Sequence, residues 1–143
     1  MLTKSKARNF RILNHTADTG IIAYGVDLKQ AFANAAKGMF SLITDLRKVS
    51  ERTSKNISVT AADREALLVA WLNELVYFFD TEQMLFKRFD ITEMTDTIIK
   101  ARVYGEKADL ARHPMKIGIK STTYHMLQVS QNDGYQARVI FDI

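Results

Sequence analysis

The alternation of apolar and polar residues predicts two short strands near the start of the chain. Residues 9–12 alternate between polar and apolar, and residues 21–24 form an apolar run. The polar segment between them holds His15, Thr16 and Asp18. We expect these side chains on a turn between two strands, where they are fixed and accessible. Thr and Asp often stabilise turns through local hydrogen bonds, so these residues alone favour a self-capping turn over a site.

Two stretches with helical periodicity follow. Apolar residues recur three and four positions apart from residue 28 to about residue 45, directly after Asp27. A second, broader apolar pattern begins after Asp63 and extends to Phe79. We therefore expect two helices capped by Asp27 and Asp63, of which the second is the more buried. Asn73 interrupts the second apolar face, and we expect it to face solvent.

The remaining pattern is that of strands. Turn signals lie at Asp96-Thr97 and at Asn132-Asp133-Gly134, and a loop is expected from Glu106 to Pro114. Strands, helix, strand, helix and a run of antiparallel strands predict an α+β fold. In it, two main helices pack on a mostly antiparallel sheet as a two-layer sandwich, rather than in a doubly wound parallel fold. The expected later strands cover residues 54–60, 85–92, 98–105, 117–129 and 135–141.

Composition limits the class of protein. The chain has 143 residues, of which 47% are hydrophobic, so we expect one domain over residues 10–143 behind a flexible basic tail, residues 1–9. The absence of cysteine excludes disulfides, thiolate zinc sites and cysteine nucleophiles. No apolar stretch approaches the roughly 20 residues of a membrane span, and the tail lacks the apolar segment of a secretion signal. A cytoplasmic location with no membrane partner is expected.

The charge pattern adds little about partners. The formal net charge of +4 is compatible with RNA nearby. The sequence contains no glycine-rich phosphate loop and no aromatic RNA-recognition signature. A plain RNA-binding module is therefore the weakest of the function classes considered.

The C-terminal residues suggest a cation site. Asp142 and Ile143 place a side-chain carboxylate and a terminal carboxylate next to each other at the end of an apolar strand. Like charges this close repel, and a bound cation relieves the repulsion. Ligation by oxygen alone suits calcium, magnesium or manganese rather than zinc. The alternative is a frayed end with both carboxylates in water, which is the commoner case.

Other chemically capable side chains are scattered. Lys120 is either a surface residue or a fixed cation that pairs with Asp18, Asp142, a phosphate or an acidic group of a partner. His125, five residues on, points to the opposite face of an extended strand unless a bulge intervenes. His15 and Asp18 are the nearest acid/base pair, but no nucleophile lies beside them. His113, before the single proline, is a further candidate.

Several blocks of the sequence form an ordered set of motifs. They include Asn14-His15-Thr16-Ala17-Asp18, Asp63-Arg64-Glu65-Ala66-Leu67-Leu68, Tyr104-Gly105-Glu106, Lys120-Ser121-Thr122-Thr123-Tyr124-His125 and Arg138-Val139-Ile140-Phe141-Asp142-Ile143. This set resembles the archease family, and the resemblance covers nearly the whole chain from about Phe10. Asn14 stands where the family usually has Asp, which removes one carboxylate, and Ser121-Thr122 replaces a more apolar pair.

The resemblance implies a protein cofactor, not an enzyme, so no catalytic residue is assigned. Archeases serve the RtcB-type RNA-splicing ligase, promoting its guanylylation and multiple turnover in tRNA splicing and RNA repair. The implied partners are the ligase and, through it, RNA and the ligase-bound guanylate. The implied divalent metal, calcium first with magnesium or manganese as alternatives, is held by Asp18, Asp142 and a main-chain oxygen of Ile143. His15, Lys120 and His125 are the residues expected to act on the partner.

Three rival functions stay open. One is a metal-dependent phosphoester enzyme that uses His15 and Asp18 for acid/base work. A second is an RNA-binding module, and a third is a chaperone-like role toward the ligase or other RNA enzymes. Turnover without the ligase would favour the first, and strong, salt-dependent RNA affinity would favour the second.

Overall fold

The computed structural model describes residues 9–14 and 19–143. It contains two long helices, α2 (Leu28–Ile43) and α3 (Arg64–Glu82), and a short 3-10 helix, η1 (Leu46–Lys48). The strands are β1 (Phe10–Asn14), β2 (Thr19–Gly25), β3 (Thr53–Thr60), β4 (Met84–Met94), β5 (Ile98–Lys107), β6 (Ser121–Gln131) and β7 (Tyr135–Asp142). The expected element order is confirmed.

Both helices begin where the sequence predicts. The side chain of Asp27 accepts a hydrogen bond from the backbone N–H of Gln30, and Asp63 does the same for Ala66, each at 2.8 Å. These contacts satisfy backbone donors that the first helical turn leaves free. Helix α3 ends at Glu82 and is capped by Gln83, whose N–H donates to the carbonyl oxygen of Phe79 at 2.9 Å.

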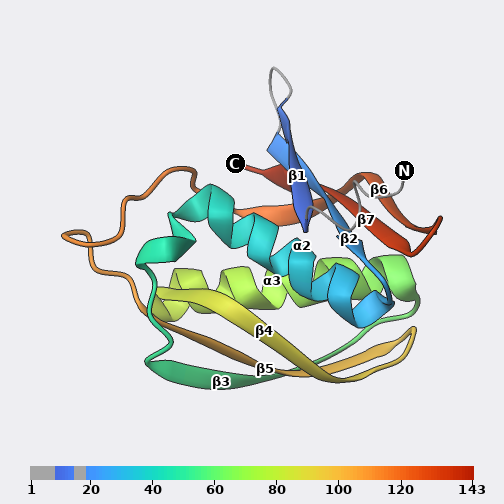
Figure 1. The fold of residues 1–143 in the computed structure, drawn as a ribbon, viewed down its shortest axis with the longest axis horizontal. Helices are drawn as coiled ribbons and strands as arrows, with labels where there is room; N and C mark the ends of the chain where they lie inside the picture. Colours follow the sequence, from blue (N-terminus) through green and yellow to red (C-terminus); the bar gives the residue numbers. More distant parts are fainter. Residues whose placement is uncertain (1–8, 15–18) are drawn as a thin grey trace.

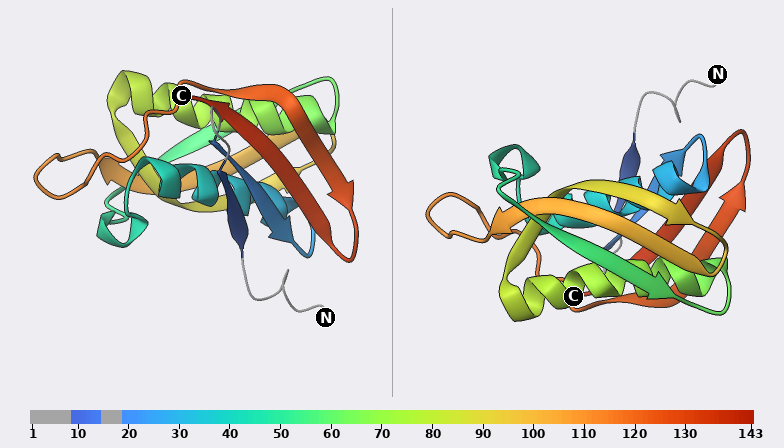
Figure 2. Two further views of the ribbon diagram at one scale, coloured as in Figure 1. Left: turned by 90° about the horizontal axis from the view of Figure 1, so that it is seen from above. Right: turned by 90° about the horizontal axis from the view of Figure 1, so that it is seen from below.

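The strands form two antiparallel sheets. One has the order β1-β2-β7-β6 and the other β3-β5-β4. Helices α2 and α3 lie between them, and each contacts strands of both sheets (Figure 1). From above, the four-stranded sheet covers the helices, and from below the three-stranded sheet does (Figure 2). The predicted α+β class, with two helices packed on antiparallel strands, is confirmed. The predicted two-layer arrangement is corrected, because the strands divide into two sheets and the helices form a third layer between them.

One hydrophobic core joins the three layers. Trp71 of α3 is fully buried, and its indole N–H donates to the carbonyl oxygen of Phe32 in α2 at 3.0 Å. The ring of Phe40 lies 5.7 Å from Phe86 and 5.9 Å from Phe89, measured between centroids. Aromatic pairs at these separations contribute beyond the area they bury, so α2 is fixed against β4.

Most strand boundaries differ from the prediction by one or two residues, and two of the differences change the environment of the residues concerned. Strand β5 continues to Lys107, so Glu106 is in a strand and not in a loop. Strand β6 starts at Ser121, because the preceding residues cover the end of α2 instead of pairing in a sheet. There, the N–H groups of Lys116 and Ile117 donate to the last-turn carbonyls of α2 at 2.8 and 3.2 Å. These carbonyls have no partner within the helix, so the loop satisfies them.

The described ranges contain no helix that is both long and apolar enough to cross a membrane.

We predict that Gly105→Ala unfolds the three-stranded sheet whereas Gly118→Ala does not. A Cβ at Gly105 would overlap the backbone oxygen of Leu85, which cannot move without breaking the β4–β5 ladder. A Cβ at Gly118 meets nothing within 4 Å. Urea denaturation should show a loss of about 3 kcal/mol or more for Gly105→Ala and a change within about 0.5 kcal/mol for Gly118→Ala. Equal stability of the two variants would contradict this packing.

Candidate functional site

The predicted C-terminal site lies at one end of the four-stranded sheet. Asp142 pairs with Ser121 of β6, and the N–H of Lys120 donates to the carbonyl oxygen of Asp142 at 2.8 Å. On the other side of β7, Phe141 pairs with Thr19 at the start of β2. The structure therefore brings Lys120 and Asp142 together, and we call this region the Asp142 end of the sheet.

The side chains at the Asp142 end are open to solvent. Lys120, Asp142 and Ile143 are exposed, while the preceding Ile119 is buried and anchors the strand start in the core. Within the described residues, the carboxylate of Asp142 takes part in no hydrogen bond or ion pair. An acidic oxygen donor without a protein partner is the kind that a hard cation or a basic partner group binds.

His15 and Asp18 lie outside the described residues. The described residues on either side of them, Asn14 and Thr19, pair with each other across β1 and β2. Because Thr19 also pairs with Phe141, Asn14 and Thr19 lie at the same end of the sheet as Asp142. Within residues 9–14 and 19–143, no group of three or more His, Asp, Glu or Cys side chains is placed to hold a metal. The metal site expected from the sequence includes Asp18, so it stays a prediction.

His125 lies in an irregular part of β6. The pairing with β7 is interrupted between Thr123 and Gln128, and His125 is exposed within this interruption. On the sequence alone, a bulge between Lys120 and His125 was required if the two residues were to share a site. The structure contains such a bulge. The described contacts do not bring His125 to Asp142 or Lys120.

Asn73 supports the Asp142 end from below. Its side-chain oxygen accepts the backbone N–H of Thr122 at 2.8 Å, so helix α3 fixes the first residues of β6. The prediction that Asn73 faces solvent is therefore wrong. The sequence did offer a signal for this contact, because Asn73 is a polar residue within a broad apolar helix face that packs against the sheet. The hydroxyl of Thr122 itself is buried without a hydrogen-bond partner among the described residues.

A second polar cluster, which the sequence reasoning missed, surrounds Glu106. Its carboxylate is almost fully buried and receives four donors. Arg52 Nε and Arg112 Nη2 contact Oε1 at 3.1 and 2.6 Å, and Ser50 N and His113 Nε2 contact Oε2 at 2.8 and 3.0 Å. The carboxylate thus joins β5 to the loop that precedes β3 and to the loop that follows β5. We call these five residues the Glu106 cluster.

The donors determine the charge of Glu106. Burial would raise the pKa of its carboxyl, but the hydrogen bonds from Ser50, Arg112 and His113 outweigh burial and lower the pKa to about 2. His113 is fully buried, and its Nδ1 accepts the N–H of Asp109 at 2.8 Å. A neutral His113 ring therefore carries its proton on Nε2, facing Glu106. The carboxylate of Glu106 is therefore ionised, and both of its oxygens are contacted by donors. This arrangement is typical of a structural role.

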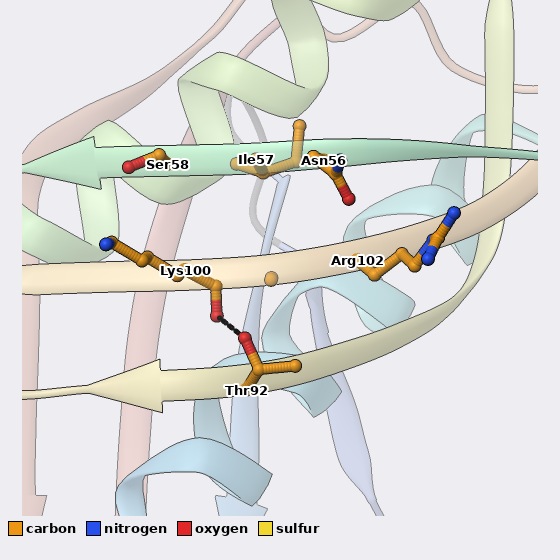
Figure 3. A pocket seen from close by; sticks show the side chains of 7 residues that line it. Asn56, Ile57, Ser58, Thr92, Lys100 and Arg102 are labelled. Carbon is orange, nitrogen blue, oxygen red and sulfur yellow. Dashed lines mark hydrogen bonds between the residues drawn. The ribbon is translucent and has the colours of Figure 1, made fainter.

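The outer face of the three-stranded sheet carries a shallow hollow of about 470 Å³. Lys100 and Arg102 of β5 lie along its floor, flanked by Asn56 and Ser58 of β3 and by Thr92 of β4 (Figure 3). Its cations are partly compensated, since Lys100 lies 3.8 Å from Glu93 and Arg102 donates to the hydroxyl of Ser54 at 3.2 Å. None of the predicted site residues lines this hollow.

Comparison with known proteins gives consistent matches. Residues 10–143 match the model of the Archease protein family. Protein archease from Methanosarcina acetivorans is 39% identical over 144 residues, covering 97% of this chain and 99% of the relative. The solution structure of protein 1598 from Methanobacterium thermoautotrophicum is 36% identical, with a TM-score of 0.79 over 94% of this chain and 99% of that chain.

A more distant structure shares the fold. The crystal structure of an archease described as a possible chaperone, from Thermotoga maritima, has a TM-score of 0.58 at 16% identity. It covers 93% of this chain and 96% of that chain. At this identity, the likeness supports the architecture of two sheets and two helices.

The Glu106 cluster predicts a specific loss of stability in acid. The folded pKa of Glu106 lies below its ordinary value of 4.5, so its contribution is complete above pH 4.5 and is lost as the pH falls toward about 2. Glu106→Gln removes the charge that four donors require, and we expect it to cost about 2 kcal/mol at pH 7. The difference from the unsubstituted protein should shrink progressively below pH 4.5, as measured by urea denaturation at a series of pH values.

Glu93→Gln is the matched control for this series. Its side chain is 56% exposed and its ion pair with Lys100 spans 3.8 Å, so its removal should change stability by less than about 0.5 kcal/mol. A Glu106→Gln variant with the same stability and pH profile as this control would contradict a buried, ionised Glu106.

Proposed function

The chain belongs to the archease family, and on this premise we propose that it is a protein cofactor of an RtcB-type RNA-splicing ligase. In this role it promotes guanylylation of the ligase and allows multiple turnover in tRNA splicing and RNA repair. It catalyses no step itself. The ligase holds the guanylate and the RNA, and the cofactor acts on the ligase, in the cytoplasm.

The observation that carries this proposal is the exposed, unpartnered carboxylate at the Asp142 end. A buried acid that only stabilises the fold is surrounded by donors, as Glu106 is. The side chain of Asp142 has no such partner within the described residues, although its backbone is fixed by pairing to β6. A rigid backbone with a free carboxylate suits a group that acts on something outside the chain.

The chemistry of these residues suits a hard divalent cation. In the proposed site, Asp142 would supply a carboxylate and Ile143 a main-chain oxygen. Asp18, which lies outside the described residues, is proposed as the second carboxylate. Calcium is the first candidate, with magnesium and manganese as alternatives, since all three prefer oxygen ligands. When bound, the cation would supply positive charge for phosphate oxygens of the ligase-bound nucleotide. Asn14 in place of Asp leaves an amide oxygen as a weaker donor.

Lys120, His15 and His125 are proposed to orient the ligase. The backbone N–H of Lys120 donates to the carbonyl oxygen of Asp142, so the two residues are neighbours at this end of the sheet, and both are exposed. A lysine there can pair with an acidic residue or a phosphate of the partner. His125 extends the same strand into its exposed irregular segment.

We predict that Asp142→Asn abolishes most of the stimulation of ligase guanylylation and multiple-turnover RNA ligation. The substitution removes one charge but retains the size of the side chain and the backbone pairing with Lys120 and Ser121. Calcium, magnesium and manganese titrations followed by calorimetry should show metal affinity reduced about tenfold or more, which corresponds to about 1.4 kcal/mol. The ligation assay uses substoichiometric cofactor and a ligase of established activity.

Asp133→Asn is the control, because Asp133 lies in the turn at the opposite end of the β6–β7 hairpin. It should stimulate like the unsubstituted chain. If neither the unsubstituted chain nor the Asp133→Asn variant stimulates a competent ligase, the proposed cofactor role is wrong. Phosphoester turnover without ligase would then favour an enzyme, and strong RNA binding that weakens steeply with salt would favour an RNA-binding module.

A further inference from the structure

Strand β6 carries a large bulge opposite the middle of β7. Thr123 pairs with Ile140 and Gln128 pairs with Arg138, so five steps along β6 span only two steps along β7. The residues in between, Tyr124 to Leu127, make no ladder pairs. Because β6 is an edge strand of its sheet, the bulge faces no further strand. Bulges at sheet edges re-aim side chains and recur beside functional sites.

The bulge holds an unfavourable backbone conformation. Within the described residues, three non-glycine residues have a positive φ: Gln83, Asp133 and Met126. Gln83 caps α3, and Asp133 precedes Gly134 in a hairpin turn, where such angles are ordinary. Met126, with φ 56°, is inside a strand, and it is a long apolar residue that rarely adopts this conformation. Strain of this kind persists only where the surroundings enforce it.

Side chains of β6 and β7 hold the bulge in this conformation. Arg138 Nε donates to the carbonyl oxygen of Met126 at 2.9 Å. The hydroxyl of Thr123 donates to the carbonyl oxygen of Ile140 at 2.9 Å and lies 3.3 Å from the N–H of His125, which it can accept. The bulge is therefore a built feature and not a frayed strand end.

The bulge turns apolar side chains outward. Thr122 and Val129 both face the core, although they are seven residues apart, so the bulge changes the inward and outward alternation of β6. In a regular strand that starts with Thr122 facing inward, Tyr124 and Met126 would also face inward. Instead, 64% of Tyr124 and 46% of Met126 are exposed. The sequence thus places two large apolar residues in water at the expense of local backbone strain.

We propose that the bulge of β6, through Tyr124 and Met126, is a docking element that inserts into an apolar pocket of the partner ligase. The inference rests on the proposed cofactor function and extends it to the surface that provides affinity. Exposed aromatic and methionine side chains are enriched at the centres of protein interfaces. Met126 fills irregular pockets because it is unbranched, and its strained backbone holds it in a fixed position before binding.

A protein pocket fits the chemistry of the bulge better than a nucleic acid does. Residues 124–127 include no lysine, arginine or carboxylate, and the nearby Arg138 guanidinium is already bonded to the bulge. RNA binding draws most of its affinity from cations on phosphates. The bulge is also continuous with the Asp142 end, since Ser121 and Thr122, just before it, pair with Asp142 and Phe141. A partner seated over Asp142 therefore lies next to the bulge.

The test compares Tyr124→Ala and Met126→Gly in ligase stimulation as a function of cofactor concentration. Both variants should raise the concentration for half-maximal stimulation about tenfold, the effect of losing one interface anchor, while the maximum at saturation is retained. Asp142→Asn should lower the maximum instead. Thermal unfolding provides an independent measurement: Met126→Gly should keep or raise the midpoint, because glycine adopts positive φ without strain.

Val26→Ala is the matched control, since Val26 is 72% exposed and adjoins the opposite end of the sheet. It should stimulate like the unsubstituted chain. If both bulge variants reach half-maximal stimulation at the same concentration as the unsubstituted chain, the docking inference is wrong, but the proposed cofactor function is unaffected. No stimulation by the unsubstituted chain would overturn both. Loss of RNA binding by Tyr124→Ala in a ligase-free anisotropy assay would also overturn docking to a protein pocket.

Discussion

The pairing of β7 between β2 and β6 is the constraint on which the proposed site depends. Ala137, Val139 and Phe141 alternate toward the core and are fully or almost fully buried. Because a slip of one residue would turn this set to solvent, the hydrophobic core fixes the register of the last strand. That register in turn determines that Asp142 lies opposite Ser121, one position beyond the pair of Phe141 with Thr19. The position of the exposed carboxylate thus follows from the burial of its neighbours.

Local signals in the sequence predicted most elements of the fold. Asp27 and Asp63 cap helices, and Asn132-Asp133-Gly134 forms the last hairpin turn, because each acts on backbone groups a few residues away. The division into two sheets was not predictable in this way. Alternating strands look alike whichever sheet they join, and the assignment depends on which helix face covers them.

The same reasoning explains what was missed at the candidate site. Glu106 continues the outward side of β5 and looks solvent-exposed by alternation, yet loops more than fifty residues apart in the chain cover it. The bulge in β6 was also invisible, because Tyr124 and Met126 alternate as strand residues should. Lys120 and Asp142 were predictable as candidates, since their chemistry is evident in the sequence, but their adjacency required the register of β7.

Glu106 and Asp142 differ in the groups that contact their carboxylates, and this difference distinguishes a structural acid from a candidate functional one. The carboxylate of Glu106 is contacted by four donors from two separate loops, so its charge is compensated within the protein. The carboxylate of Asp142 has a fixed backbone and no described partner, so its charge is available to a cation or a basic group. The same contrast holds for apolar groups: Trp71 is fully buried, while Tyr124 is held outward by a strained bulge. Among the described residues, exposed groups on fixed backbone lie along β6 and at the end of β7. This shared location, more than any single residue, is why we propose this surface for the partner.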